Sequence, residues 1–434
     1  MKVTEKKAGD GRVRLDAVAS PAEVNHAFKV AEQSFAQQAG LRPVSGKTVA
    51  QAAEEQLGIK DLDSIIRKDA LEFLAPFAID KRNLVPAYPS SPSSTEVLQR
   101  NKPFEFSQVV TLKPDYELDS YDPVSLVVPP LHIDPSEVEA QIAQILDNYA
   151  DYEPADPRPI QPGDAMDVAL SVSQEGKPLD ALNTDNRLYI MGMGFMPPSF
   201  DENVVGMNVG ETKTFSFALP GAESEGEFEC TVTINELKRK KVPELTDEWV
   251  ASHFPMYPNA EAMRQFVEAS MTDELRRQRD ELMTTMAAAE IAKRFHGKID
   301  DAVYEAMRKT LLENMQLNVT AQGVSMNDFI QSQGGEQQFG MMLMLQTRQM
   351  LVQGYALDAV FRHEKMELTD EDVLAAAASI NPQNPAAGKR SMEEMGRGFA
   401  LREMAARTKA NKWLVENAIV SEFDPESQGD EPTA

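Results

Sequence analysis

The chain has 434 residues, of which 42% are hydrophobic and 26% charged, and its formal net charge is -26. This length exceeds what one hydrophobic core usually organises, so several domains are expected. The acidic balance argues against binding to DNA, and no apolar run approaches the roughly 18 residues of a membrane span. The first residues lack the apolar core of a signal peptide, and the lone Cys230 excludes an internal disulfide, which together predict a cytoplasmic location.

Residues 1–115 alternate between strand and helix signals. Ser20 stands where an N-cap belongs, Pro21 follows at the first helical position, and Glu23 completes a capping box. Gly58 interrupts a later helical pattern, as expected of a break between two helices. The elements expected in this region are a short strand around 13–15, a helix from Ser20 to about Gly40, helical segments over 49–79 and a strand over 104–112. This mixture predicts an α+β domain.

The first 50 residues are locally basic. They hold eight basic and five acidic side chains, a net charge of +3 on a chain that is acidic as a whole. Such an asymmetry suits docking on an RNA-rich particle. An ordinary solvated surface has the same composition, and charge alone leaves both interpretations open.

Residues 116–158 and 159–242 differ in pattern. The first segment is rich in proline at both ends and holds one helical pattern over 136–149, which predicts a linker whose helix packs on the C-terminal domain. The second segment shows strand alternation over 166–172, 187–191, 212–219 and 228–234, with a short helical turn over 199–205. These features predict a compact domain built on an antiparallel β-sheet.

From residue 243 the pattern is helical. An uninterrupted pattern over 259–295 would extend roughly 50 Å at ~1.5 Å per residue, so it can hardly fold back into a small globule. Further helices are expected over 300–322, 339–364, 370–378 and 392–420. Residues 243–421 are therefore predicted to form an all-α domain with long helical arms, followed by a disordered acidic tail over 422–434. Sixteen of the 22 methionines lie after residue 250, where they either present an adaptable apolar surface or fill gaps in a core.

Residues that would carry other chemistry are absent or scattered. The five histidines include no pair at i, i+4 spacing, so no metal site is predicted, and no cofactor is expected. The segment from Ser45 to Thr48 resembles the end of a phosphate-binding loop, but Leu41 stands where the first glycine is required. Gly192 and Gly194 lack the third glycine of a dinucleotide fingerprint and predict a turn. A nucleotide-dependent remodeler is therefore the least favoured of three functional hypotheses.

The segment Gly40-Leu41-Arg42-Pro43-Val44-Ser45-Gly46-Lys47-Thr48 resembles the ribosome-binding signature of the trigger factor family, Gly-Phe-Arg-x-Gly-Lys-x-Pro. Here Leu41 replaces the phenylalanine, and two residues are inserted before Gly46. The order of the surrounding segments resembles the family along nearly the whole chain. The resemblance implies a ribosome-binding loop in which Arg42 offers a planar fork and Lys47 a point charge to phosphate or carboxylate groups. This loop comprises Gly40, Leu41, Arg42, Gly46 and Lys47, and an ordinary charged turn is the alternative.

The segment from Leu188 to Asp201 resembles the strand, turn and Ile-Pro-Gly-Phe-Glu motif of prolyl isomerases of the FK506-binding-protein type. An apolar pocket can accelerate X-Pro rotation, whose barrier is about 20 kcal/mol, by favouring the twisted amide. By this correspondence the candidate catalytic pocket consists of Val168, Asp180, Met196, Pro197, Phe200 and Cys230. Because Val168 and Cys230 stand where aromatic residues are expected, and the loop over 220–224 lacks the usual tyrosine, weak or absent isomerase activity is predicted.

The resemblance as a whole implies an ATP-independent chaperone with three parts: an N-terminal ribosome-binding domain, a domain of the FK506-binding type and an all-α C-terminal domain. Its implied partners are the large ribosomal subunit near the exit tunnel and nascent or unfolded polypeptides, with no DNA and no membrane. It leaves room for a homodimer away from the ribosome. The leading hypothesis is that helical arms and methionine-rich faces hold unfolded segments. The alternative is a prolyl isomerase that acts on free proteins without ribosome docking.

Overall fold

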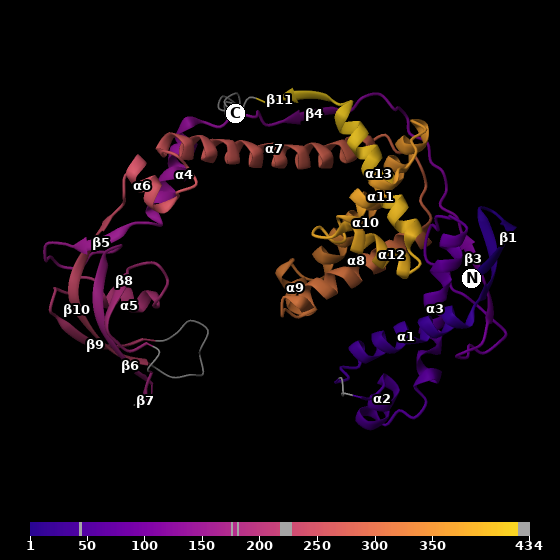
Figure 1. Ribbon diagram of the computed structural model, residues 1–434, viewed down its shortest axis with the longest axis horizontal. Helices are drawn as coiled ribbons and strands as arrows, with labels where there is room; N and C mark the ends of the chain where they lie inside the picture. The colour runs from indigo at the N-terminus through magenta and orange to yellow at the C-terminus, as the bar shows by residue number, and fades with distance from the viewer. Residues whose placement is uncertain (43–45, 175–176, 180–181, 218–227, 424–434) are drawn as a thin grey trace. The chain divides into compact units, whose positions relative to one another are not determined.

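The computed structural model describes residues 1–434 apart from 43–45, 175–176, 180–181, 218–227 and 424–434 (Figure 1). The chain forms two compact units, one made of residues 1–130 and 278–434 and the other of residues 131–277. Part of the predicted ribosome-binding loop, the predicted pocket residue Asp180, the loop over 220–224 and the tail from residue 424 lie outside the described residues. None of the described helices is both long and apolar enough to cross a membrane.

A three-stranded antiparallel sheet begins the first unit. It consists of β1 (Lys2–Gly9), β2 (Arg12–Ala19) and β3 (Phe104–Thr111), in that order. The central strand β2 alternates buried and exposed side chains, as the pattern predicts. The sequence does not predict β1, because nearly all of its side chains are exposed and the apolar alternation is missing.

Three helices accompany this sheet: α1 (Pro21–Gln38), α2 (Val49–Leu57) and α3 (Leu62–Lys81). The predicted capping box is confirmed, since the Glu23 backbone N–H donates to the Ser20 hydroxyl and the Glu23 carboxylate accepts from the Ser20 backbone N–H. The break at Gly58 is confirmed as well, because this glycine ends α2 with a φ of 73° that other residues rarely adopt. Helices and sheet share one core, which includes Leu15, Phe28, Ile66, Leu74 and Phe106.

Helices make up most of the rest of the first unit. They are the later part of α7 (Ala260–Ala292), then α8 (Asp301–Ala321), α9 (Met326–Ser332), α10 (Glu336–His363), α11 (Asp370–Ala377), α12 (Pro385–Glu394) and α13 (Gly398–Glu416). The predicted helices over 259–295, 300–322, 339–364 and 370–378 agree with α7, α8, α10 and α11 to within a few residues. The short α9 has no counterpart among the predicted helices.

The prediction of one helix over 392–420 is wrong at two places. Gly396 adopts a φ of 67° between α12 and α13, and a side chain there would lie 2.7 Å from the backbone nitrogen of Phe77. The close approach to α3 therefore fixes a glycine turn where the pattern suggests continuity. Beyond α13 the chain forms β11 (Ile419–Glu422), which pairs in parallel with β4 (Ser125–Val128). That pairing joins segments almost 300 residues apart, which a local pattern cannot predict.

Within the first unit, α9 and the adjoining ends of α8 and α10 project away from α11, α12 and α13 (Figure 1). We call residues 310–348 of these three helices the arm. Its own small core brings together Leu311, Phe339 and Leu343, with Phe329 of α9 at the edge. The Phe329 and Phe339 rings meet at 6.2 Å in a T-shaped arrangement, which is a favourable geometry for aromatic pairs.

The second unit contains a six-stranded antiparallel sheet. Its strands are β5 (Asp151–Pro154), β6 (Ala165–Gln174), β7 (Lys177–Pro178), β8 (Thr184–Ile190), β9 (Thr212–Phe217) and β10 (Phe228–Lys241). The long strands β6 and β10 pair in the middle, and α5 (Pro198–Val204) contributes Phe200 and Val204 to the core. The four predicted strand runs correspond to β6, β8, β9 and β10, whereas β5 and β7 have no predicted counterpart.

A helical cluster completes the second unit. It consists of α4 (Pro135–Asp147), α6 (Asp247–His253) and the first part of α7. Apolar side chains of α4 pack against Val267 of α7, and Glu139 pairs with Arg264 at 2.8 Å. The linker helix therefore packs on residues that the sequence pattern assigns to the C-terminal helical domain.

Candidate functional site

The arm leaves several large apolar side chains exposed. Leu317 of α8 and Met341, Met344 and Leu345 of α10 each expose 57–69% of their surface. Folding of the arm does not use these side chains, so they are free to contact a partner.

The arm can expose one apolar stripe because a second one holds it together. Phe339, Leu343 and Thr347 of α10 are buried and recur at intervals of four residues, which places them on one side of the helix. Met341, Met344 and Leu345 occupy other positions of the helical turn and remain in solvent. The first half of α10 is therefore apolar on two sides, of which only one is needed for packing.

A groove of about 340 Å³ lies between α8 and α10 on the arm. Its lining consists of Tyr304, Glu305, Arg308, Met344, Leu345, Thr347 and Arg348. The buried Thr347 directs its hydroxyl to the Leu343 carbonyl at 2.6 Å, so this small polar group is satisfied within the helix. Arg308 pairs with Glu305 at 2.7 Å, whereas Arg348 has no ion-pair partner among the residues that the structure describes.

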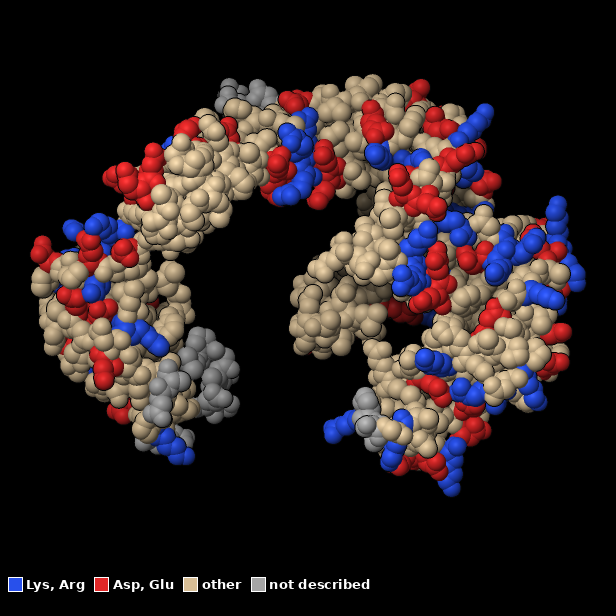
Figure 2. All heavy atoms as spheres, in the orientation of Figure 1, with Lys and Arg blue, Asp and Glu red and all other residues tan. Residues whose placement is uncertain are grey.

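The arm is almost free of charge. From residue 314 to residue 347 the only charged side chains are Asp328 and Glu336, although 26% of the whole chain is charged. Ten of these 34 residues are glutamine or asparagine, whose amides can both donate and accept hydrogen bonds. Figure 2 shows the contrast, since uncharged atoms cover the end of the arm while charged atoms crowd the rest of the same unit.

The predicted ribosome-binding loop joins α1 to α2. Gly40 adopts a φ of 63° just beyond α1, and Leu41 is partly buried against the core of the N-terminal domain. Gln56 fixes the backbone of Arg42 by accepting from its N–H at 3.1 Å and donating to its carbonyl at 2.9 Å. The Arg42 side chain is exposed and has no partner among the described residues. The backbone is therefore held in place, and the guanidinium extends into solvent, where it can bind an anion.

The second cation of this loop is less free. Lys47 pairs with Glu55 of α2 at 2.6 Å, and both side chains are largely exposed. Thr48 caps α2 by accepting from the Gln51 backbone N–H, and Gly46 before it has a φ of 79°. An exposed pair of this kind stabilises little, so an anionic partner could displace Glu55 from Lys47 at small cost.

The structure brings five of the six predicted pocket residues together and buries them. Val168, Met196, Phe200 and Cys230 belong to one core cluster of the strand-rich domain and are at most 5% exposed. Pro197 at the start of α5 is buried too. Burial raises the pKa of the Cys230 thiol to about 11, so this group is a neutral apolar wall at physiological pH.

An aspartate that the sequence analysis did not single out holds the turn after β8. The Asp201 carboxylate accepts from the Tyr189 hydroxyl and from the backbone N–H of Gly192 at 3.0 Å. Tyr189 is buried against the ring of Phe200, and burial, reinforced by the Asp201 charge, raises its pKa. The phenol is therefore neutral and serves as a fixed donor. Its inward position in the alternation of β8 is the signal that could have identified it.

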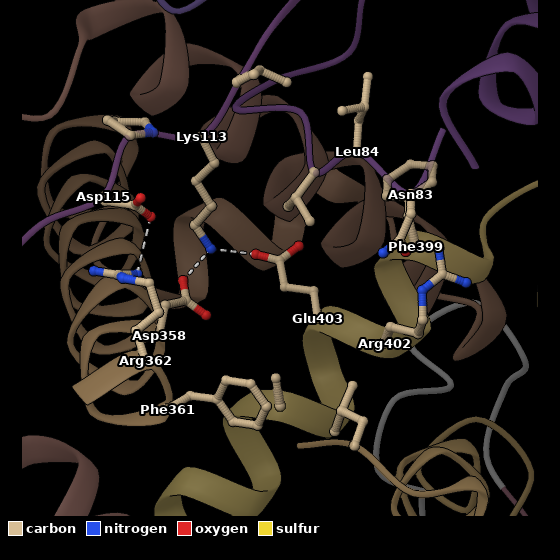
Figure 3. Close-up of a pocket in the computed structure, with 15 residues that line it drawn as sticks. Asn83, Leu84, Lys113, Asp115, Asp358, Phe361, Arg362, Phe399, Arg402 and Glu403 are labelled. Atoms are coloured by element: carbon tan, nitrogen blue, oxygen red, sulfur yellow. Dashed lines mark hydrogen bonds and ion pairs between the residues drawn. The ribbon is translucent and has the colours of Figure 1, made fainter. Parts of the chain in front are cut away.

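A second cavity, of about 390 Å³, lies where the N-terminal domain meets α10 and α13 (Figure 3). Lys113 extends into it between the carboxylates of Asp358 and Glu403, and Arg407 pairs with Asp358 at 3.0 Å. Lys113 and Asp358 are 245 residues apart in sequence, so no spacing rule could have predicted this cluster.

The cavity offers little free charge to a ligand, because the cations that line it are paired. Burial alone would raise the pKa of Asp358, but the charges and hydrogen bonds of Arg407 and Lys113 outweigh burial and hold that pKa below its ordinary value. Gly354 makes room for this contact, since a side chain there would lie 2.8 Å from the Arg407 guanidinium. The cluster therefore ties the N-terminal domain to the helices. Among the described residues, no group of His, Cys, Asp and Glu could hold a metal ion.

Comparison with known proteins gives two matches to family models. The model described as bacterial trigger factor protein matches residues 1–145, and the model described as the bacterial trigger factor C-terminus matches residues 259–416. Together they span more than half of the chain. They flank the strand-rich domain and include both the predicted ribosome-binding loop and the arm.

Individual relatives extend the similarity to the full length. The trigger factor of Thermobifida fusca is 26% identical over 86% of this chain and 81% of its own length, and that of Desulforudis audaxviator is 24% identical over 99% and 100%. The trigger factor of Streptomyces coelicolor is 24% identical over 98% and 92%. A solved structure titled "Promiscuous Substrate Recognition in Folding and Assembly Activities of the Trigger Factor Chaperone" covers 96% of this chain and 99% of its own, at 17% identity and a TM-score of 0.44.

Proposed function

The chain belongs to the trigger factor family of chaperones, and we propose that its arm is the surface that holds nascent or unfolded polypeptides, without any nucleotide. The observation that carries the proposal is the exposed, uncharged apolar surface of Leu317, Met341, Met344 and Leu345. An unfolded segment exposes apolar side chains together with backbone amides that lack partners. Methionine adapts to apolar groups of many shapes, and glutamine and asparagine can pair with backbone donors and acceptors alike.

The lack of charge on the arm supports low specificity. A charged surface would repel client segments of like charge and would have to be desolvated before an apolar contact could form. The arm avoids both costs. Weak, reversible contacts of this kind allow release without an energy source.

A triple substitution tests the arm. In the variant with Met341→Asn, Met344→Asn and Leu345→Asn, suppression of aggregation of a chemically unfolded client should fall by at least about tenfold per mole of chaperone. A factor of ten corresponds to about 1.4 kcal/mol, and roughly 1.5–3 kcal/mol accompanies each large apolar side chain that is fully buried. The matched control replaces three exposed apolar residues of the N-terminal domain, Leu57→Asn, Ile65→Asn and Val97→Asn, and should suppress aggregation like the parent. A folded arm variant with undiminished suppression would rule out the arm as the holding surface.

Docking on the large ribosomal subunit near the exit tunnel is proposed for the loop over residues 40–48. The support is the exposed guanidinium of Arg42 on a backbone fixed by Gln56, beside the displaceable pair of Lys47 and Glu55. In the variant Arg42→Glu with Lys47→Glu, co-sedimentation with ribosomes should be lost. The control Lys7→Glu with Lys29→Glu changes the net charge of the same 50 residues equally but lies outside the loop, and it should sediment like the parent. Equal sedimentation of both variants would contradict the assignment.

For residues 159–242 we propose an isomerase-type domain with weak or absent prolyl isomerase activity, used mainly as an additional client surface. The support is that Val168, Met196, Phe200 and Cys230 are packed into the domain core. Activity on a proline-containing peptide that equals that of an intact enzyme of the FK506-binding type would instead favour a prolyl isomerase acting on free proteins. Deletion of residues 155–240 separates the two: a chaperone that holds clients on the arm keeps its aggregation suppression.

A further inference from the structure

Arg187 of β8 lies on the inner face of the strand-rich domain. It stands directly opposite Val168 of β6, which is fully buried in the core. Residues directly opposite each other in an antiparallel pair project to the same face, so the Arg187 side chain is directed toward the apolar face. The neighbouring Leu188 is 41% exposed on the other face, in keeping with the alternation. An arginine thus occupies an inward position where an apolar residue is expected.

The guanidinium of Arg187 has no acceptor among the residues that the structure describes. Its Nη1 atom is buried and makes no hydrogen bond, and neither of its other nitrogens has a partner among the described residues. Two described acids of this domain are engaged elsewhere, since Asp167 pairs with Lys238 at 3.1 Å and Asp201 accepts from Tyr189, whereas Asp180 lies outside the described residues. Arg187 as a whole is partly exposed, but a guanidinium cannot lose its proton in a protein, so a buried guanidinium nitrogen without an acceptor is costly and needs an explanation.

The contact that Arg187 does make is with an exposed ring. Its guanidinium carbon lies 4.9 Å from the centroid of Phe195, and this phenylalanine is 55% exposed. Met193 in the same turn is 74% exposed. A cation–π contact satisfies the charge only in part, whereas Phe195 and Met193 add an apolar surface next to it. A free cation beside an exposed apolar surface matches an acidic side chain with an apolar neighbour.

We propose that Arg187 binds the carboxylate of an aspartate or glutamate in a client segment, while an apolar residue next to that acid packs on Phe195. The proposal rests on the proposed role of residues 159–242 as a client surface. A carboxylate is the ligand of choice because its two oxygens match two parallel N–H groups of a guanidinium. The strand-rich domain would thereby select acidic segments, in contrast to the uncharged arm, which does not distinguish clients by charge.

The test compares two fluorescently labelled peptides. In both, one variable residue lies between an aromatic residue and a proline; this residue is glutamate in the first peptide and glutamine in the second. Anisotropy titrations with the full-length chain should show about tenfold tighter binding of the Glu peptide, in the range expected of a charge-assisted bidentate pair. Arg187→Gln should reduce this ratio to about one. The control Arg239→Gln removes an arginine of the same domain that is 73% exposed and only 3.9 Å from Glu153, and it should keep the parent ratio.

Two results would overturn the proposal: equal affinities of the parent for both peptides, or a ratio that survives Arg187→Gln. Arg187 makes no hydrogen bond or ion pair with the described residues, so Arg187→Gln should not destabilise the fold. If this variant nevertheless fails to fold, Arg187→Lys keeps the charge but lacks the two parallel N–H groups and should give an intermediate ratio. The proposal that the arm holds unfolded clients can fail independently of the proposal for Arg187. It would appear as undiminished aggregation suppression in the arm variant, with the Glu to Gln ratio unchanged.

Discussion

The two halves of α10 have opposite characters. In the first half, on the arm, Phe339, Leu343 and Thr347 form a single buried stripe, and Met341, Met344 and Leu345 face solvent. Charge near these side chains lies at the base of the arm, where Arg348 and two residues of α8 line the same groove as Met344 and Leu345. In the second half, residues are buried on nearly every side, and Asp358 sits in a cluster of paired charges. One continuous helix therefore has a recognition end and an anchoring end.

The difference shows how a chaperone can expose apolar surface without unfolding. The anchoring end is held by ion pairs that are specific in geometry and costly to break, and these fix the helix to the N-terminal domain and to α13. The recognition end needs only one packed stripe because the rest of the helix is secured elsewhere. Substitutions of the paired charges at the anchoring end should therefore affect stability, and those of the exposed apolar side chains at the recognition end should affect client binding.

The largest effect is expected at the buried carboxylate. Asp358→Ala removes one of the two carboxylates that Lys113 and Arg407 share and leaves only Glu403. It should lower the free energy of unfolding of the first unit by about 3 kcal/mol, the low end of the range for a broken buried pair. Urea denaturation followed by circular dichroism measures this. Glu313→Ala removes an acid of the arm that pairs loosely with Lys309 at 3.8 Å, and it should cost under about 0.5 kcal/mol. Similar losses in both variants would remove the distinction between the two ends.

Two glycines of α10 allow a matched comparison within one helix. A side chain at Gly354 would lie 2.8 Å from the Arg407 guanidinium, whereas one at Gly340 would meet nothing within 4 Å. Gly354→Ala should therefore destabilise by about 1–3 kcal/mol, because Arg407 must move away from Asp358. Gly340→Ala should instead stabilise by about 0.5–1 kcal/mol, because alanine favours a helix over the unfolded chain. Thermal melts should show a melting temperature below that of the parent for Gly354→Ala and above it for Gly340→Ala. A shift in the same direction for both variants would contradict the packing described for this helix.

The dependence of folding stability on pH should also arise among the paired charges, as at Asp372 of α11. Hydrogen bonds from Lys409 and from the Thr369 backbone lower the pKa of Asp372 from 3.8 to about 2. A carboxylate with a depressed pKa stabilises the folded state above its unfolded pKa, and this contribution disappears as the pH falls through its folded pKa. Asp372→Asn should therefore melt below the parent near neutral pH, and the gap should close as the pH falls from about 4 to about 2. A gap that stays constant over this range would show that the carboxylate charge is not what stabilises α11.

Local signals predicted the elements that depend on neighbouring residues. The capping box at Ser20 and the break at Gly58 are each contained within a few residues, and both are confirmed. The sequence pattern gave wrong predictions where contacts between distant segments determine the local structure. The turn at Gly396 exists because α3 packs closely against it, and β11 exists because β4 pairs with it.

The candidate sites also combine features that neighbouring residues determine with features that depend on distant contacts. The methionine-rich helices could be predicted from composition, but which methionines are exposed depends on the stripe that α10 uses for packing. The cluster around Lys113 draws its partners from two distant helices, α10 and α13, and Arg187 faces inward only because of its register with β6. In sequence, an arginine in a strand predicts a surface position. Charge partners and register are properties of the folded chain, and no spacing rule contains them.

The smallest expected effect is on the salt dependence of client binding by the arm. Because residues 314–347 carry only Asp328 and Glu336, screening has little charge to act on there. Affinity for an uncharged, apolar unfolded segment should change by less than about twofold between roughly 0.05 and 0.5 M salt, over which the Debye length shortens severalfold. Ribosome co-sedimentation, which is proposed to depend on Arg42 and Lys47, should weaken steeply over the same series. If client affinity fell in parallel with ribosome binding, charged groups outside the arm would have to hold the client, and the division of α10 into a recognition end and an anchoring end would lose its functional meaning.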